Sequence, residues 1–140
     1  MTRGIEIIMK ITALEVASRY VYPSVRRRLV EILYKEFKLT QVEVASILKL
    51  TQSAVSRYLQ KNRGMFLEVE KFNSIDAEIK KLAGDIIEKK LNAYEIHSEL
   101  TRITLLLLSK GYGCAFHHKI DEDIDPENCK TCIQLFKNLK

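Results

Sequence analysis

Apolar residues recur every three or four positions along most of this chain, which is the spacing of one face of an α-helix. Only 2 prolines and 5 glycines interrupt the 140 residues, so few positions are suited to breaking a helix. No internal repeat or low-complexity run is present. The pattern therefore predicts a nearly all-α protein.

The first third of the chain predicts two helices in succession. The first covers Ala13 to Tyr20. Pro23 then suits the first turn of the second helix, where its missing N–H breaks no hydrogen bond, and this helix runs to Phe37. Its inward face should carry Val25, Leu29, Ile32 and Leu33.

The segment from Leu39 to Leu59 predicts two short helices joined by a tight turn that contains Leu50. Thr40 is a good N-cap, Glu43 completes a capping box with it, and Thr51 can cap the second helix. This arrangement is typical of a helix-turn-helix, whose second helix lies in the major groove of DNA. The buried positions are expected at Val44, Ile47 and Leu48 in the first helix and at Val55, Tyr58 and Leu59 in the second.

The outer face of the second short helix carries side chains that suit the edges of bases. A glutamine such as Gln52 can pair with adenine through two hydrogen bonds, and an arginine such as Arg57 with guanine. Ser53 and Ser56 can bond to either partner. The hydroxyl of Thr51, with the free amides at the start of the helix, suits a phosphate.

The residue pairs Thr40-Gln41, Val44-Ala45, Thr51-Gln52 and Val55-Ser56 resemble the helix-turn-helix of the lambda-repressor-like family. The chain is more closely similar to a group of small archaeal regulators, from roughly Met9 to Gly64, including the lead-in RYVYPSVRRRLVEILYKEF.

The resemblance implies that Gln41 and Gln52, which open the two helices, cooperate at one base and a phosphate. The family usually has glycine in the turn, where this chain has Lys49. We therefore expect a residue with a Cβ in a left-handed conformation there, at a cost of roughly 1 kcal/mol.

The excess of positive over negative charge lies wholly in the half of the chain that contains this motif. Residues 1–64 hold 12 lysines and arginines against 5 acidic residues, whereas residues 65–140 hold 11 against 13. Such a basic half attracts a polyanion, with binding that weakens as salt rises. The expected phosphate contacts are Arg26, Arg27, Arg28, Arg57, Lys61 and Arg63, although the first three also fit the solvated face of a helix.

The middle of the chain predicts a connection and two long helices. Met65 to Phe72 alternates apolar and polar residues, which fits either an extended linker or a small wing. Asn73 or Ser74 then opens a helix, and Asn92 with Glu95 forms the capping box of the next. The first of these helices should bury Ile75, Ile79, Leu82 and Ile86.

The last long helix is apolar nearly all round and ends at Gly111. A helix of this kind is buried on more than one side. We expect its second side to pack against another copy of the chain, because a homodimer also presents two recognition helices to two DNA half-sites. The alternative is that the leucines pack only within one chain. They are Leu100, Leu105, Leu106, Leu107 and Leu108, with Ile96 and Ile103.

All 3 cysteines fall in the last part of the chain, in a C-x2-H and a C-x2-C pattern. Four soft ligands at this spacing suit a tetrahedral Cys3His metal site. The predicted ligands are Cys114, His117, Cys129 and Cys132, with His118 or Asp121 as a substitute for the fourth. Pro126 is expected to begin a terminal helix that carries Cys129 and Cys132 on adjacent turns.

Two cofactors fit these ligands. Zinc would stabilise the fold of a tail that has no hydrophobic core of its own. An iron–sulfur cluster on the three thiolates would instead make the protein a redox or iron sensor. A metal-free thiol switch at Cys129 and Cys132 also fits the pattern, and so do free buried thiols without any such role.

The expected organisation is a helix-turn-helix domain at residues 1–64, a helical dimerisation region at 65–111 and a cysteine-rich, metal-binding tail at 112–140. No segment is apolar for long enough to span a membrane, and Ile103 to Leu108 is far too short. The N-terminus lacks a signal-peptide pattern, so a cytoplasmic protein is expected. Met9 is a second candidate start, which would make residues 1–8 an extension.

Three classes of function follow from these features. The first is a homodimeric, sequence-specific transcription regulator of double-stranded DNA whose binding is modulated by the cysteine site. The second is a constitutive DNA-binding or assembly protein with a purely structural zinc. The third is an enzyme that uses Cys114 with His117 or His118, but the chain has no glycine-rich phosphate loop and no carboxylate dyad. We do not expect catalysis.

Overall fold

The computed structural model describes residues 10–138, so the second candidate start at Met9 lies outside the described residues. Helices make up the regular structure of this range, and no strand occurs in it. The all-α prediction is therefore confirmed. The elements are α1 (Ala13–Val16), the π-helical turn η1 (Ala17–Val21), α2 (Tyr22–Lys35), α3 (Gln41–Leu48), α4 (Gln52–Leu59), the 3-10 turn η2 (Val69–Lys71), α5 (Asn73–Lys89), α6 (Ala93–Ser109), α7 (Cys114–Ile120) and α8 (Thr131–Leu135).

The two helices expected before residue 38 form one continuous helix of α1, η1 and α2, with Pro23 inside it. A proline in a helix lacks an N–H and crowds the carbonyl four residues earlier. The π-helical turn relieves this conflict, because the Tyr22 N–H reaches back five residues to the Ala17 carbonyl. The hydroxyl of Ser24 donates to the Tyr20 carbonyl at 2.8 Å. The prediction of separate helices was wrong because the π-helical turn lets one continuous helix accommodate Pro23.

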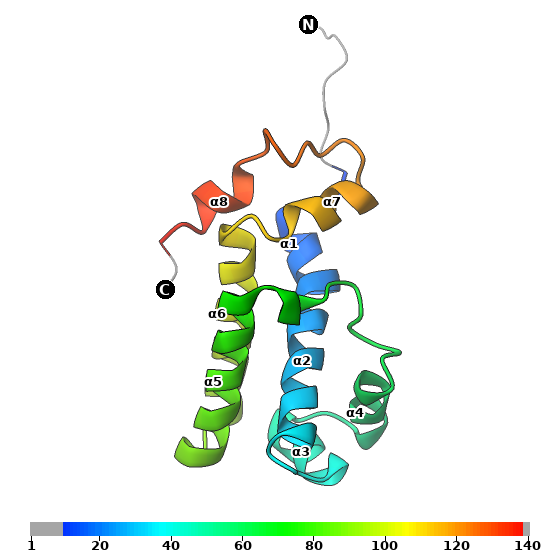
Figure 1. The fold of residues 1–140 in the computed structure, drawn as a ribbon, viewed down its shortest axis with the longest axis vertical. Coiled ribbons are helices and arrows are strands. Elements are labelled where there is room, and N and C mark those ends of the chain that lie inside the picture. Colours follow the sequence, from blue (N-terminus) through cyan, green and yellow to red (C-terminus); the bar gives the residue numbers. More distant parts are fainter. Residues whose placement is uncertain (1–9, 139–140) are drawn as a thin grey trace, which may run out of the picture.

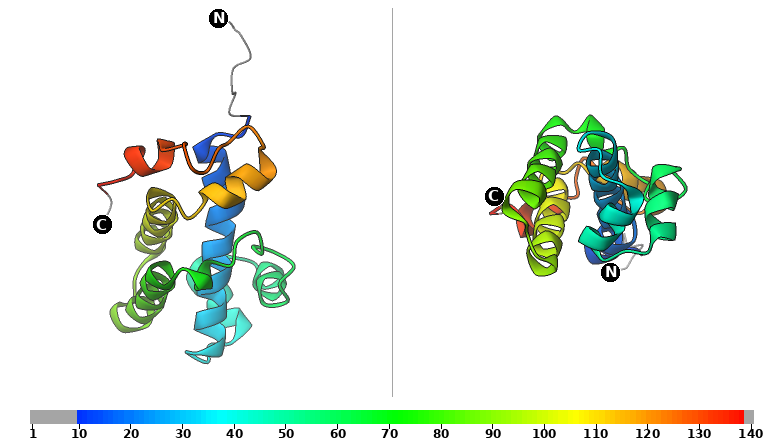
Figure 2. Two further views of the ribbon diagram at one scale, coloured as in Figure 1. Left: turned by 45° about the horizontal axis from the view of Figure 1, so that its top comes forward. Right: turned by 90° about the horizontal axis from the view of Figure 1, so that it is seen from below.

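This long helix is the centre of the molecule, and the other elements lie around it (Figure 1). The antiparallel pair α5 and α6 packs on one side of α2, whereas α3 and α4 pack near its C-terminal end (Figure 2). At the opposite end, α7 lies beside the start of α1, and α8 packs on the end of α6 (Figure 1). The α3–α4 pair and the cysteine-containing segment are thus at opposite ends of the molecule.

The leucine-rich helix α6 is covered within a single chain. It packs against α2, η1, α5 and α8, and more lightly against α3. Neighbours within the chain therefore cover much of its apolar surface. The buried positions are Ile96, Leu100, Ile103, Leu107 and Leu108, while Leu105 and Leu106 are half-buried.

The connection between α4 and α5 is a linker and not a wing, since residues 65–72 form a loop with the turn η2 and no strand. Leu67 and Val69 are buried in the core, at 6% and 0% exposure. The apolar positions that suggested a strand are thus anchors of a packed loop.

None of the helices in residues 10–138 is long and apolar enough to cross a membrane.

Candidate nucleic-acid interface

The two short helices form where the caps predict them. Thr40 Oγ1 accepts from the Glu43 N–H at 3.1 Å, and Glu43 Oε1 accepts from the Thr40 N–H at 2.9 Å, which completes the capping box of α3. Thr51 Oγ1 accepts from the Ala54 N–H at 3.0 Å at the start of α4. Lys49 has φ 57° and ψ 41°, as expected for a residue that replaces glycine in the turn. The caps and the turn are confirmed, and they fix how α4 leaves α3.

The helix α4 presents a polar face to solvent. Val55 and Tyr58 are fully buried, whereas Gln52, Ser53 and Arg57 are exposed. Ser56 is half-buried, and its hydroxyl accepts from the Gln60 side-chain amide at 3.2 Å. The outward side chains of α4 are therefore those that the sequence assigned to base contacts, with Ser56 already engaged.

Gln41 and Gln52 line the same surface depression, with a volume of about 730 Å³. No acidic side chain lines it. Lys35 and Lys38, which precede α3, bring two positive charges to its rim. Sequence reasoning missed these two lysines, although their position just before the Thr40 cap was a usable signal. The remaining lining residues are Tyr34, Leu39, Thr40 and Val42.

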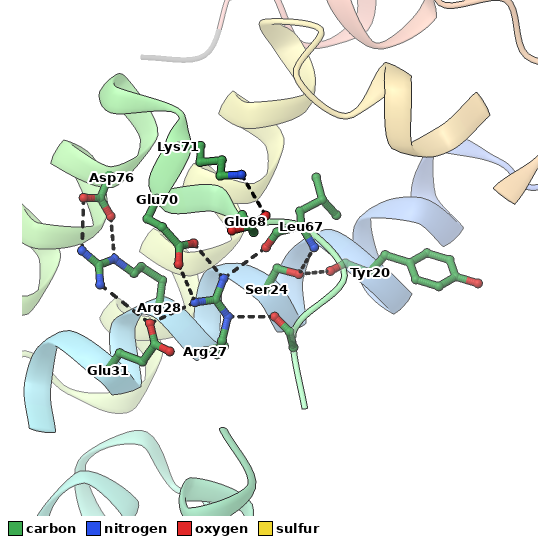
Figure 3. A network of polar contacts seen from close by, with 11 residues as sticks. Tyr20, Ser24, Arg27, Arg28, Glu31, Leu67, Glu68, Glu70, Lys71 and Asp76 are labelled. Atoms are coloured by element: carbon green, nitrogen blue, oxygen red, sulfur yellow. Dashed lines mark hydrogen bonds and ion pairs between the residues drawn. The ribbon is translucent and has the colours of Figure 1, made fainter. Parts of the chain in front are cut away.

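Arg27, predicted to contact phosphate, is instead the centre of a buried polar network (Figure 3). Its side chain is 0% exposed, and its Nε donates to the Gly64 carbonyl at 2.9 Å. Nη1 donates to Glu31 and Glu70, and Nη2 to Glu70 and the Leu67 carbonyl. A guanidinium has five N–H donors, and these bonds use them all. Arg27 therefore has no donor left for a phosphate, which corrects its assignment to the DNA interface.

The neighbouring arginines also have structural partners. Arg28 donates to both carboxylate oxygens of Asp76, at 2.7 and 3.3 Å, and so ties α2 to α5. Arg26 lies over the rings of Tyr22 and Tyr58 and donates from Nε to the Tyr58 hydroxyl at 2.9 Å. The three arginines are consecutive residues of one helix, so they differ in the direction in which each side chain points and not in residue type.

The other predicted phosphate contacts remain accessible. Arg57 and Lys61 are exposed, and Arg63 is half-buried with its guanidinium 5.7 Å from the centre of the Tyr58 ring. Thr51 is exposed at the start of α4. With Lys35 and Lys38, these residues leave a basic, polar surface around the exposed face of α4.

The candidate metal ligands do not form one coordination set. In the range 10–138, no group of three or more His, Cys, Asp or Glu side chains is arranged to hold a metal ion. His117 Nε2 bonds to the Ile11 carbonyl, and His118 Nδ1 to the Ile124 carbonyl. Asp121 Oδ2 accepts from the N–H groups of Lys10 and Ile11, at 2.7 and 2.9 Å. All three candidates for the fourth ligand are therefore engaged with the backbone.

The three cysteine side chains are buried or half-buried, and their thiols influence one another's pKa. Burial raises the pKa of Cys132 to about 11, with further contributions from Cys114 and Cys129. Burial also raises the pKa of Cys114, and Cys129 adds to that shift. Since metal ligation requires thiolates, a cation at this cluster would have to overcome these raised pKa values.

The segment that carries Cys129 differs from the prediction. Pro126 lies in a turn, and the terminal helix α8 begins at Thr131. Cys132 is therefore in this helix and buried, whereas Cys129 precedes it and is half-buried. The prediction of a helix from Pro126 was wrong because Asp125 caps a local turn, where its carboxylate accepts from the Glu127 N–H at 3.0 Å.

Comparison of the chain with known proteins found no matching family model, no matching curated protein and no matching solved structure.

Proposed function

We propose that this protein is a sequence-specific DNA-binding transcription regulator of the lambda-repressor-like helix-turn-helix type, with α4 as its recognition helix. One observation carries the proposal. Gln41 and Gln52, which open α3 and α4, line one depression that no acidic residue enters and that two lysines border. Amide side chains in a basic surface suit the combination of a base edge and a phosphate.

The exposed face of α4 supports the same function. Gln52, Ser53 and Arg57 point to solvent from a helix whose opposite side is fixed by the buried Val55 and Tyr58. A rigid helix that presents bidentate donors is suited to direct readout in the major groove. The phosphate contacts in this proposal come from Thr51, Lys35, Lys38, Lys61 and Arg63.

The proposed regulator acts in the cytoplasm. It acts as a homodimer, because paired recognition helices match two half-sites about one DNA turn apart. Leu100, Leu107 and Leu108 of α6 are buried within one chain, whereas Leu105 and Leu106 are only half-buried. Two exposed apolar side chains, Leu14 in α1 at 70% exposure and Tyr94 at the start of α6 at 85% exposure, are available for contacts between chains.

The cysteine cluster is the proposed control element. Cys132 lies in α8, which packs on α6, so a change in the ligation or oxidation of the thiols has a route to the helical core. A regulator must couple such a change to a difference in DNA affinity between two states. The alternative is a constitutive DNA-binding protein in which zinc on the thiols has only a structural role.

Selection of duplexes from a random DNA pool tests the main proposal. We expect the full chain to enrich one sequence, and Gln52→Ala to relax the preference at one or two base pairs at a cost of about 1–3 kcal/mol. Lys81→Ala on the exposed face of α5 is the matched control and should leave the enriched sequence unchanged. If the pool shows no enrichment, or if Gln52→Ala selects the same sequence with the same affinity, α4 is not the recognition helix.

Metal analysis and visible absorption of protein purified without oxygen test the control element. Iron with acid-labile sulfide favours the regulator with a cluster, and one zinc per chain favours the structural alternative. Under the leading proposal, DNA affinity should differ between the loaded and the metal-free protein. Equal affinity of the two forms would leave the cysteines without a regulatory role.

A further inference from the structure

A second pocket lies between the turn that follows α3 and the first half of α6, with the middle of the long helix as its floor. Its volume is about 340 Å³, near the low end of the range of small-molecule sites. Apolar side chains from two elements make most of its wall. They are Ile47 and Leu48 from α3, with Ala93, Tyr94, Ile96 and Leu100 from α6.

Arg26 and Lys49 bring two positive charges to the lining, Tyr22 and His97 complete it, and no acidic side chain joins them. Neither Arg26 nor Lys49 forms an ion pair with a carboxylate among the residues that the structure describes. Arg26 differs in this from the next two residues, since Arg27 pairs with two glutamates and Arg28 with Asp76. The pocket therefore concentrates positive charge that this part of the chain does not neutralise.

Arg26 is held in place without an acidic partner. Its guanidinium lies 5.1 Å from the centre of the Tyr22 ring and 5.7 Å from that of Tyr58. Its Nε donates to the Tyr58 hydroxyl at 2.9 Å, and the Tyr22 hydroxyl lies 3.3 Å from His97 Nδ1. A guanidinium held by two aromatic rings is pre-organised, so the arginine side chain loses little further entropy when an anion binds to it.

We propose that this pocket binds a small organic carboxylate with an apolar body. The carboxylate pairs with the guanidinium of Arg26, with Lys49 adding to the positive potential, and the apolar body contacts Ile47, Ile96 and Leu100. Arginine suits a planar carboxylate through two parallel hydrogen bonds. An apolar wall favours an amphipathic acid over a small hydrated anion such as phosphate. This binding does not depend on the DNA-binding function.

Amide NMR spectra of the full chain, titrated with phenylacetate, hexanoate and indole-3-acetate, test the site. We expect at least one of these acids to give saturable shifts at the amides of Lys49, His97 and Leu100. The neutral isostere 2-phenylethanol should bind about tenfold or more weakly than phenylacetate, because it cannot form a charge-assisted pair. Inorganic phosphate at the same concentration should not displace the bound acid.

Two variants test which basic side chain binds the carboxylate of the acid. The same spectra report whether each variant is folded. Arg26→Gln should lower the affinity for the acid about tenfold or more, and Lys49→Gln, at an exposed position, should lower it by a smaller factor. Lys81→Gln lies outside the pocket and should bind the acid like the parent chain. The proposal fails if no acid gives saturable shifts, if the shifts lie elsewhere, if 2-phenylethanol or phosphate competes equally, or if both pocket variants bind like the parent.

Discussion

Arg27 and Glu70 form a bidentate ion pair across 43 positions of sequence, in which Nη1 donates to Oε2 at 3.1 Å and Nη2 to Oε1 at 2.9 Å. The pair fastens the turn η2 to the middle of α2 and so fixes where the linker enters α5 (Figure 3). Burial by itself would raise the pKa of Glu70, but the hydrogen bonds from Arg27 and from a backbone N–H, together with the charges of Arg27 and Arg28, outweigh it and leave that pKa below its ordinary value. The carboxylate therefore stays charged in the folded protein.

Replacement of Arg27 by methionine should destabilise the fold by about 3–5 kcal/mol, because it leaves the buried carboxylate of Glu31 and two carbonyl groups without their donor. Arg27→Lys should recover only part of the loss, since an ammonium cannot reproduce the five-donor geometry. Urea unfolding at pH 7 measures both variants. Arg57→Ala, at an exposed site, should stay within about 0.5 kcal/mol of the parent. Equal stability of Arg27→Met and the parent would contradict the role of the network.

Gln41 and Gln52 should act as a unit on DNA, since both line one depression. In a double-mutant cycle on the selected duplex, the alanine variants should show a coupling energy of about 0.5 kcal/mol or more. Each single variant then weakens binding, and the second loses less in the background of the first. A parallel cycle of Gln41→Ala with Lys61→Ala is the control, because Lys61 does not line the depression. Additive losses for the glutamine pair would show that they contact DNA independently.

Lys90 follows α5 with φ 52° and ψ 54°, a left-handed conformation that strains any residue with a Cβ. Lys90→Gly should therefore stabilise the fold by about 1 kcal/mol, even though glycine loses more backbone entropy on folding. Lys81→Gly, in the interior of the same helix, should destabilise it by roughly 0.5–1 kcal/mol. Thermal unfolding of both variants checks the prediction, and a loss of stability in both would exclude strain at Lys90.

The carboxylate of Asp121 holds the start of the described chain against α7. The backbone N–H of Ile11 contributes most to lowering the pKa of Asp121, and the N–H groups of Asp123 and Lys10 add to it. A lowered folded-state pKa adds stability above the ordinary aspartate pKa of about 3.9, and this stability disappears as the pH falls through the folded-state value.

Asp121→Asn should consequently lower stability more at pH 7 than at pH 3. Unfolding in urea at the two pH values measures the difference. Exchange rates of the Lys10 and Ile11 amides, which should rise in the variant at pH 7, localise the effect. The same loss of stability at both pH values would mean that the charge of Asp121 plays no part.

Local chemistry made much of the secondary structure predictable from the chain. The capping boxes of Thr40 with Glu43 and of Asn92 with Glu95 form where their residue types and spacing required, because their hydrogen bonds join positions only three residues apart. The left-handed Lys49 was expected from the resemblance to the lambda-repressor-like family, which usually has glycine at this position of the turn. The exposed face of α4 followed from the helical period alone.

Contacts distant in sequence decided the rest. Arg26, Arg27 and Arg28 are the same residue type, but successive side chains on a helix point about 100° apart, so each one contacts a different neighbour. Arg26 meets two tyrosine rings, Arg27 a buried network and Arg28 the helix α5. The chain by itself determined where α3, α4, α5 and α6 form, because caps and period act over one or two turns. It did not determine that the first two predicted helices join across Pro23 or that α8 begins only at Thr131. Only the packing of those helices decided which charges remain on the surface and which groups His117 and Asp121 engage, since each of these partners lies dozens of residues away.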